Sequence, residues 1–285
     1  SRPAPASRSR GHPFRATSRH PGDAACHQVV QPQHPRTPYD ERMLVILPPS
    51  ETKEPGGEND PMELSFPELN PVRNHIMDVL AAIPAEEQLA FLKISPRLIE
   101  QAEANTVLRT TPTMSSIYRY TGVLFDALDA ATLPDDALAH ILIGSALFGV
   151  TRATDAIPAY RLSGNTTLPG KLTLRSLWKD ALTPTLEGLP EFIVDMRSGA
   201  YLNLGPIKKP AVGVCTIRVE TEQADGSRKV VSHFNKHYKG ELARYLAMNA
   251  QQATTLEEIA SIARMGGFRV ETSGTQLTLI TPDNK

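Results

Sequence analysis

Short apolar runs of strand length recur along this chain between stretches of helical periodicity, and this alternation limits the folds that it can adopt. The runs are residues 43–47, 141–143, 191–195, 212–220 and 228–234. The last two flank Asp225-Gly226, a dipeptide that strongly predicts a β-hairpin. The runs do not follow one another with the regular helix spacing of repeated βαβ units. We therefore expect an α+β fold, a single domain with a mixed β-sheet surrounded by helices.

The longest helical region is predicted over residues 71–109. Pro84 and Pro96 divide it, because proline removes a backbone donor and disfavours helix in the residue before it. The predicted helices are 71–82, 85–92 and 96–104, followed along the chain by 114–130, 171–182, 235–249 and 255–265. Short helices joined by tight turns that contain proline resemble a helix-hairpin-helix segment.

Residues 1–42 differ in composition from the rest of the chain. They contain seven arginines, seven of the 24 prolines and four of the eight histidines, but no leucine or isoleucine. Such a segment cannot bury enough apolar surface to offset the entropy that it would lose on ordering. We expect a disordered Arg/Pro-rich leader over 1–42, natural or from gene-start assignment, that takes no part in the fold. The folded domain is expected over 43–285.

Charge and cysteine usage narrow the functional classes. The formal net charge is −1, but residues 1–42 carry +4 and the remainder −5. A mildly acidic body argues against binding nucleic acid through overall charge, so such binding would need a local basic patch. No apolar run reaches the roughly 18 residues of a membrane span. Cys26 and Cys215 lie far apart, as expected of a protein in the reducing cytoplasm.

The segment from Ser232 to Arg244 is the most informative for function. Lys236, His237, Lys239 and Arg244 lie in the first turns of a predicted helix. The first turn of a helix already presents unpaired N–H groups and partial positive charge. Added lysines at this end favour a bound anion, although a solvated charged helix face is the alternative interpretation.

Two other segments carry candidate anion-binding groups at predicted strand ends. Ser50 and Lys53 follow the first strand, and strand ends are where α/β proteins place ligand groups. Arg152 and Arg161 can each grip a phosphate or carboxylate in a bidentate manner. Asp155, between them, could orient an arginine or act as a base. A buried structural Arg–Asp pair is an equally good interpretation of this second segment.

The usual sequence signatures of metal binding and hydrolytic catalysis are absent. His233 and His237 are four residues apart, but no carboxylate completes a recognisable metal triad. No G-x-S-x-G elbow supports Ser-His-Asp catalysis. We therefore predict no metal site and no cofactor, and Asp155 is the candidate catalytic residue.

Six segments occur in an order that is typical of one known family. They are LVILPPSETK, YTGVLFDAL, GSALFGVTRATDAIPAYRL, SLWKDAL, VDMRSGAYLNL and SHFNKHYKGELAR. Over about residues 43–280, the chain resembles the YaaA family of peroxide-stress proteins, also called the UPF0246 or DUF328 group. The leader lies outside this resemblance.

The resemblance implies a cytosolic peroxide-stress protein that limits free iron and the oxidative DNA damage that iron drives. It also implies DNA binding through a positively charged cleft and a helix-hairpin-helix. Carried over by position, the basic residues of the cleft would be Lys53, Arg152, Arg161, Lys236, Lys239 and Arg244. The hairpin would lie within residues 83–105, where Lys93 and Arg97 could meet phosphates.

Two functional hypotheses from different classes follow. In the first, the protein binds the DNA backbone through cations and N–H groups without reading its sequence. In the second, it is an enzyme that acts on a small anionic or nucleotide-like substrate, because Asp155, Tyr160 and Tyr201 add polar function near the same cations. A structural or partner-binding role is a third alternative. The sequence does not indicate an oligomeric state.

Overall fold

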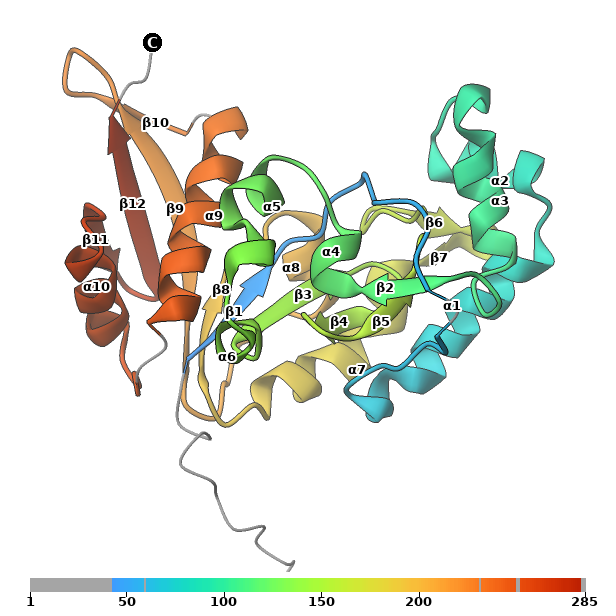
Figure 1. The fold of residues 1–285 in the computed structure, drawn as a ribbon, viewed down its shortest axis with the longest axis horizontal. Coiled ribbons are helices and arrows are strands. Elements are labelled where there is room, and N and C mark those ends of the chain that lie inside the picture. The colour runs from blue at the N-terminus through green and yellow to red at the C-terminus, as the bar shows by residue number, and fades with distance from the viewer. Residues whose placement is uncertain (1–42, 59, 231, 250–251, 283–285) are drawn as a thin grey trace, which may run out of the picture. The chain divides into compact units, whose positions relative to one another are not determined.

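The computed structural model describes residues 43–58, 60–230, 232–249 and 252–282. The leader 1–42 lies outside these residues. A mixed eight-stranded sheet runs through the described part in the order β11-β12-β9-β8-β1-β3-β4, and β10 pairs with β9 (Figure 1). Its strands are β1 Leu44–Leu47, β3 Ile141–Ser145, β4 Gly149–Arg152, β8 Phe192–Asp195, β9 Gly213–Glu222, β10 Arg228–Lys229, β11 Val270–Ser273 and β12 Gln276–Pro282. The expected α+β class with a mixed sheet is confirmed.

The centre of the sheet is parallel. Strands β12, β9, β8, β1 and β3 pair in parallel, whereas β4, β10 and β11 are antiparallel additions. Ile46 is opposite Leu142 on one side and Asp195 on the other. The carboxyl ends of β1, β3 and β8 therefore meet at one edge, and Met196 donates its N–H to Ile46 O at 2.8 Å.

Helices surround this sheet, and two small two-stranded sheets extend the loops. The helices are α1 Asn70–Ala82, α2 Ala85–Leu92, α3 Ile99–Thr106, α4 Ser116–Arg119, α5 Val123–Leu128, α6 Asp135–Leu138, α7 Leu174–Glu187, α8 Ala200–Leu204, α9 Ser232–Met248 and α10 Leu256–Met265. The small sheets pair β2 Thr113–Ser115 with β5 Ala156–Pro158, and β6 Thr167–Leu168 with β7 Leu172–Thr173. Helix α9 packs along α5, and Figure 1 shows both beside the ends of β1 and β8.

The hydrophobic core is built on three central strands of the sheet. All residues of β1, β3 and β8 are buried. Trp178 of α7 donates its indole N–H to Ala146 O at 2.8 Å, directly after β3. Gly149 has a φ of 74°, and a Cβ there would lie 2.8 Å from the Trp178 ring. The tight β3–β4 connection therefore requires glycine at this position.

Two expected elements differ in the structure. The helix expected over 114–130 is wrong as one element, since β2, α4 and α5 divide it around Tyr120 and Gly122. The strand expected over 228–234 is also too long: β10 covers Arg228–Lys229, and α9 begins at Ser232. The short helices 71–82 and 85–92 are confirmed as α1 and α2. No helix among the described residues is long and apolar enough to cross a membrane.

Candidate functional site

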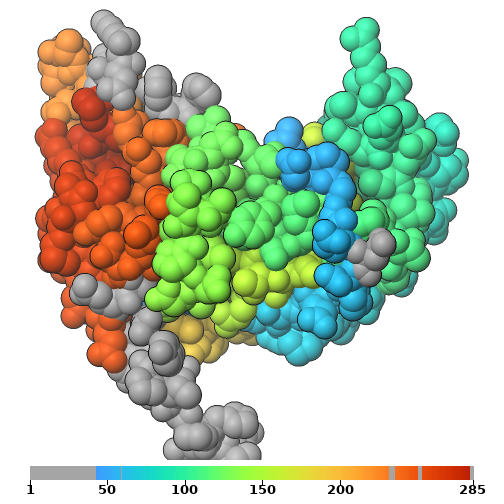
Figure 2. All heavy atoms as spheres, viewed as in Figure 1, coloured from blue at the N-terminus to red at the C-terminus, as the bar shows by residue number. Residues whose placement is uncertain are grey.

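A cleft of about 910 Å³ opens where β1 and β8 end. Its walls are the loop 48–52 after β1, residues 121–125 at α5, residues 197–202 after β8, residues 216–219 of β9 and the beginning of α9. Figure 2 shows that the surface is also hollowed between α2 and α3 on one side and α5 on the other. Ligands of sheets with parallel strands bind outside the carboxyl ends of those strands, so this cleft is the candidate site.

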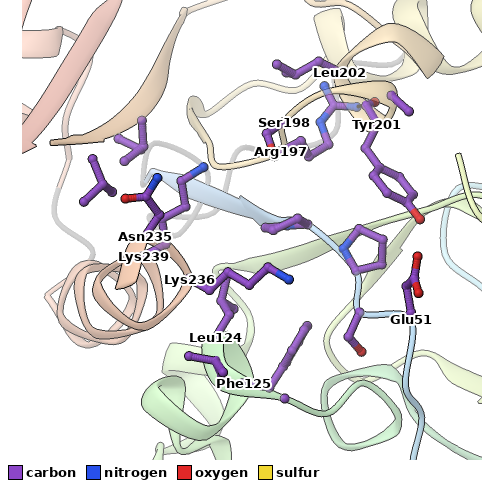
Figure 3. Close-up of a pocket in the computed structure, with 18 of the residues that line it drawn as sticks. Glu51, Leu124, Phe125, Arg197, Ser198, Tyr201, Leu202, Asn235, Lys236 and Lys239 are labelled. Carbon is purple, nitrogen blue, oxygen red and sulfur yellow. Dashed lines mark hydrogen bonds between the residues drawn. The ribbon is translucent and has the colours of Figure 1, made fainter. Parts of the chain in front are cut away.

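Two lysines of α9 project into the cleft. Figure 3 shows Lys236 extending from the helix into it, with Lys239 and Asn235 beside it. Lys239 is partly buried and donates to Met196 O at 2.9 Å. Burial lowers the pKa of Lys239, although the nearby Asp195 carboxylate opposes this shift. Asn235 also lines the cleft, and its Oδ1 is buried without a hydrogen-bond partner among the described residues.

A buried ion pair forms the base of the cleft at the end of β8. Arg197 Nε and Nη2 donate to the two carboxylate oxygens of Asp195 at 2.9 and 2.8 Å, and both residues are at most 3% exposed. The guanidinium also donates to Tyr201 O at 3.3 Å and Gly205 O at 2.9 Å. Arg197 therefore fixes the loop that leads into α8. Because four of its five N–H donors are already used within the fold, its role is to position this wall.

Lys53 directly follows the loop 48–52 that lines the cleft, and is not itself among the residues that line it. Its backbone forms a β-bridge with Tyr120, and its ammonium group donates to Ser50 O at 3.2 Å and Glu51 O at 3.3 Å. The Nζ atom is 4.2 Å from the centre of the Tyr160 ring and 5.5 Å from that of Tyr120. Burial lowers the pKa of Lys53 to about 7, and the positive charge of Arg161 adds to this effect.

Below this lysine, three hydroxyl groups form a buried chain. Tyr120 and Tyr160 share a hydrogen bond between their phenol oxygens at 2.8 Å, and Ser145 Oγ is 2.7 Å from the Tyr160 oxygen. Phe148 N donates to Ser145 Oγ at 3.0 Å. Burial raises the pKa of Tyr120 to about 12 and that of Tyr160 well above its ordinary value. Both phenols therefore stay protonated at neutral pH.

Arg161 and Glu51 form an ion pair at the mouth of this region. Arg161 Nη2 is 3.1 Å from Glu51 Oε2. The Arg161 backbone is fixed by Asn105, whose Oδ1 accepts from Arg161 N at 2.9 Å. Glu51 lines the cleft together with Tyr201 (Figure 3). A phosphate that enters here would compete with Glu51 for the Arg161 guanidinium.

The lowered pKa of Lys53 makes a prediction about stability. The unfolded lysine titrates near its ordinary pKa of 10.5 and the folded one at about 7. The free energy of unfolding should therefore rise with pH between these two values. Below pH 7, the folded protein bears the full cost of burying a charged ammonium group. We expect Lys53→Met to remove this rise, because methionine does not titrate; the full shift corresponds to at most about 5 kcal/mol. Urea unfolding of both proteins at several pH values measures it. A Lys236→Met control, at an exposed lysine, should keep the wild-type dependence.

The other predicted site residues lie outside the cleft walls. The Asp155 carboxylate accepts from Ser65 N at 3.0 Å, Ser65 Oγ at 2.7 Å and Arg152 N at 3.0 Å. The Arg152 guanidinium stacks over Phe66, 5.5 Å from the ring centre. Arg244 donates to Leu128 O and Asp129 O, both at 2.9 Å, and so closes the end of α5. These contacts hold loops and the end of a helix in place.

The turn between α2 and α3 carries the two cations expected of the hairpin. Lys93 and Arg97 are exposed there, and Lys93 ends α2 in the left-handed conformation with a φ of 56°. Ser95 Oγ accepts from Arg97 N at 3.3 Å. In the described residues, no group of three or more His, Cys, Asp or Glu side chains could hold a metal ion.

Sequence reasoning missed several residues of the site. Arg197 was not identified, although an aspartate and an arginine two residues apart at the end of a buried strand can form an ion pair, as Asp195 and Arg197 do. Arg218 also lines the cleft, where its Nε is paired with Glu220 Oε1 at 2.6 Å. The pairing of Tyr120 with Tyr160 has no local signal, because the two residues are distant along the chain and meet only in the fold.

Comparison with known proteins places these features in a family. The family model described as peroxide stress protein YaaA matches residues 43–273. A UPF0246 protein of Corynebacterium efficiens is 53% identical over 236 residues, which cover 80% of this chain and 95% of that protein. A UPF0246 protein of Streptomyces coelicolor is 36% identical over 247 residues, with 80% and 92% covered.

Proposed function

Because this chain belongs to the YaaA family of peroxide-stress proteins, we propose that it is a cytoplasmic protein that binds the DNA backbone in the cleft and helps to limit iron-driven oxidative damage. Binding of this kind reads the regular spacing of phosphates and not the bases. The alternative is an enzyme that acts on a small anionic or nucleotide-like substrate in the same cleft.

The observation that carries the proposal is the unpaired positive charge of Lys236 and Lys239 in one concave surface. The two arginines that line the cleft are neutralised, Arg197 by Asp195 and Arg218 by Glu220. Glu51, which also lines it, pairs with Arg161. Neither cleft lysine forms an ion pair within the described part of the chain.

Two cations in a concave surface supply a local positive field even though the protein is slightly acidic overall. Lys239 is also partly desolvated, as the lowered pKa of its amine indicates. A phosphate oxygen beside this amine would stabilise its protonated form. The exposed Lys93 and Arg97 of the α2–α3 turn are proposed as additional backbone contacts.

The test is binding of short labelled duplexes of unrelated sequence, measured by fluorescence anisotropy over a range of salt concentrations. We expect the logarithm of the association constant to fall linearly with the logarithm of salt concentration, with a slope of about −0.9 for each phosphate that is neutralised. Two lysine contacts require a slope of about −2 or steeper. All sequences should give the same affinity and slope.

Nicked and branched duplexes serve as further probes, because a concave surface can prefer bent or open DNA. Absence of binding to all three kinds of DNA at low salt would contradict the proposal. Affinity that depends on one sequence and hardly on salt would contradict backbone recognition in particular, since it would require direct contact with base edges.

A further inference from the structure

The cleft carries opposite charges on its two sides, which a surface for phosphates alone does not need. Figure 3 shows Lys236 and Lys239 on one side and Glu51 on the other. The Glu51 side chain is 67% exposed, and its Oε2 atom is paired with Arg161. A carboxylate in this place repels phosphate. The cleft therefore suits a ligand whose two ends differ, one of them anionic and the other a hydrogen-bond donor.

Apolar and aromatic side chains also form part of the wall. The Tyr201 ring is partly exposed and stands beside Glu51 in Figure 3. Its position is fixed, because Arg197 donates to Tyr201 O at 3.3 Å and the ring packs on Gly164, where a Cβ would lie 3.3 Å from it. The apolar residues that line the cleft include Pro48, Pro49, Leu124, Phe125 and Leu202. An aromatic face next to a carboxylate can hold a flat ring by stacking on it and accepting from its N–H groups.

The size of the cleft limits what can enter it. A volume of about 910 Å³ lies within the range of about 300–1,000 Å³ that is typical of pockets for small ligands. Such a space can hold one nucleotide, whereas a segment of duplex is much larger. A paired base also offers no free N–H groups on its pairing edge, because its partner on the other strand uses them. The nucleotide that enters is therefore an unpaired one.

We propose that the cleft binds one unpaired nucleotide, with its phosphate at the two lysines of α9, its base on the Tyr201 ring and the N–H groups of the base on Glu51. The inference rests on the proposed function, since it names the part of a nucleic acid that enters the cleft. Guanine fits best, because two of its N–H groups lie on one edge and can donate to both oxygens of a carboxylate. Thymine presents one N–H between two carbonyl oxygens, which the carboxylate repels. Binding of an intact duplex stays independent of sequence.

The pairing of Glu51 with Arg161 is compatible with this contact. The ion pair is formed by Oε2, so Oε1 can accept a hydrogen bond from the base. A carboxylate has about four lone-pair sites, so Oε2 can also accept from a second donor. Arg161 then holds the carboxylate in place, and the backbone of Arg161 is itself fixed by Asn105, whose Oδ1 accepts from Arg161 N at 2.9 Å.

Two sources supply such a ligand, namely a single strand of DNA and a free nucleotide, and the experiment measures both on the full chain. Fluorescence anisotropy gives the affinity for a short labelled strand of thymidines and for the same strand with one central guanine. Calorimetry gives the affinity for dGMP and dTMP. We expect guanine to bind about 5- to 100-fold more tightly than thymine in at least one of the two pairs, which is the usual discrimination of a good bidentate contact with a base.

Two variants separate recognition of the base from attraction of the phosphate. Glu51→Gln should reduce the preference for guanine to less than about twofold, because an amide cannot accept at both of its terminal atoms. It should also strengthen binding of the thymine probes, since Arg161 is then free to attract phosphate. Lys236→Gln should weaken binding of both bases alike and keep the preference. Circular dichroism verifies that both variants are folded.

The outcomes distinguish the inference from the function on which it rests. A preference for the strand with guanine that Glu51→Gln removes supports the inference and identifies DNA as the source. The same result with dGMP, without binding of any DNA, supports the inference and contradicts the DNA-binding function. Equal affinities for guanine and thymine, a preference that Glu51→Gln leaves intact, or no binding of any unpaired probe overturns the inference, even if an intact duplex binds.

Discussion

Replacing Asp195 with alanine should destabilise the protein by about 3–5 kcal/mol, because it leaves a buried guanidinium without its counter-charge. Arg197 is 3% exposed and donates to both Asp195 oxygens, so solvent cannot take over the role of the carboxylate. Two backbone carbonyls would remain as partners of the arginine. Urea unfolding followed by circular dichroism measures the change in the free energy of unfolding.

The matched control removes both charges at once. In the double variant Asp195→Leu, Arg197→Met, apolar side chains fill the same space, and such replacements are often neutral or stabilising. We expect it to lose much less stability than Asp195→Ala alone. A loss of less than about 1 kcal/mol in the single variant would contradict the buried pair, since exposed ion pairs contribute about that much or less.

The second large effect concerns DNA affinity. Replacing Lys236 and Lys239 together with glutamine should raise the dissociation constant for duplex DNA by about 10- to 100-fold at moderate salt, because two phosphate contacts are lost. Lys239 makes one hydrogen bond to Met196 O, and removing a desolvated charge leaves no buried ion behind. The fold should therefore tolerate the change. Anisotropy titrations at one salt concentration give the result.

Overall charge is controlled by a matched pair elsewhere. Lys171 and Lys179 are exposed and do not line the cleft. Glutamine at these two positions changes the net charge by the same amount, and should alter the affinity by less than about threefold, since distant charges are screened at physiological salt. Equal losses in both double variants would show that the protein attracts DNA through its overall field, and the cleft would lose its assigned role.

Much of the sheet could be predicted from the sequence because its central strands are buried on both faces. Such strands are continuous apolar runs, and β1, β3 and β8 were recognised on that basis. The Asp225-Gly226 turn also forms, with Gly226 N donating to Gln223 O at 2.9 Å. The local sequence was sufficient to predict a strand or turn where the apolar pattern and the turn residues indicated the same structure.

The two failures arise from tertiary contacts that local periodicity does not contain. Residues 114–130 have helical spacing, but Tyr120 is extended because it pairs with Lys53, and Gly122 has a φ of 105°, which no helix allows. In residues 228–234 the β-forming side chains favoured a strand. Strand β9 pairs with β12 along one edge and with β8 at the beginning of the other, where β10 pairs only with Thr221 and Glu222 before α9 begins at Ser232.

The candidate site could be predicted in part. Lys53, Lys236 and Lys239 were identified from their positions after a strand and at a helix start. The fold places Lys236 and Lys239 in the wall of one cleft, whereas Lys53 follows the loop that lines it. Arg152, Asp155 and Arg244 are charged residues that were predicted as part of the same site, but their contacts in the structure hold loops and a helix end in place. Their DNA-binding or catalytic roles stay predictions. Which charged groups are already paired depends on neighbours far along the chain.

The most direct measurement is the salt dependence of DNA binding by the wild type compared with the Lys236→Gln, Lys239→Gln variant. If both amines in the cleft neutralise phosphates, the slope of the variant should be shallower by about 1.8, or 0.9 for each contact. The same slope in both proteins, with unchanged affinity, would mean that DNA phosphates do not enter this cleft.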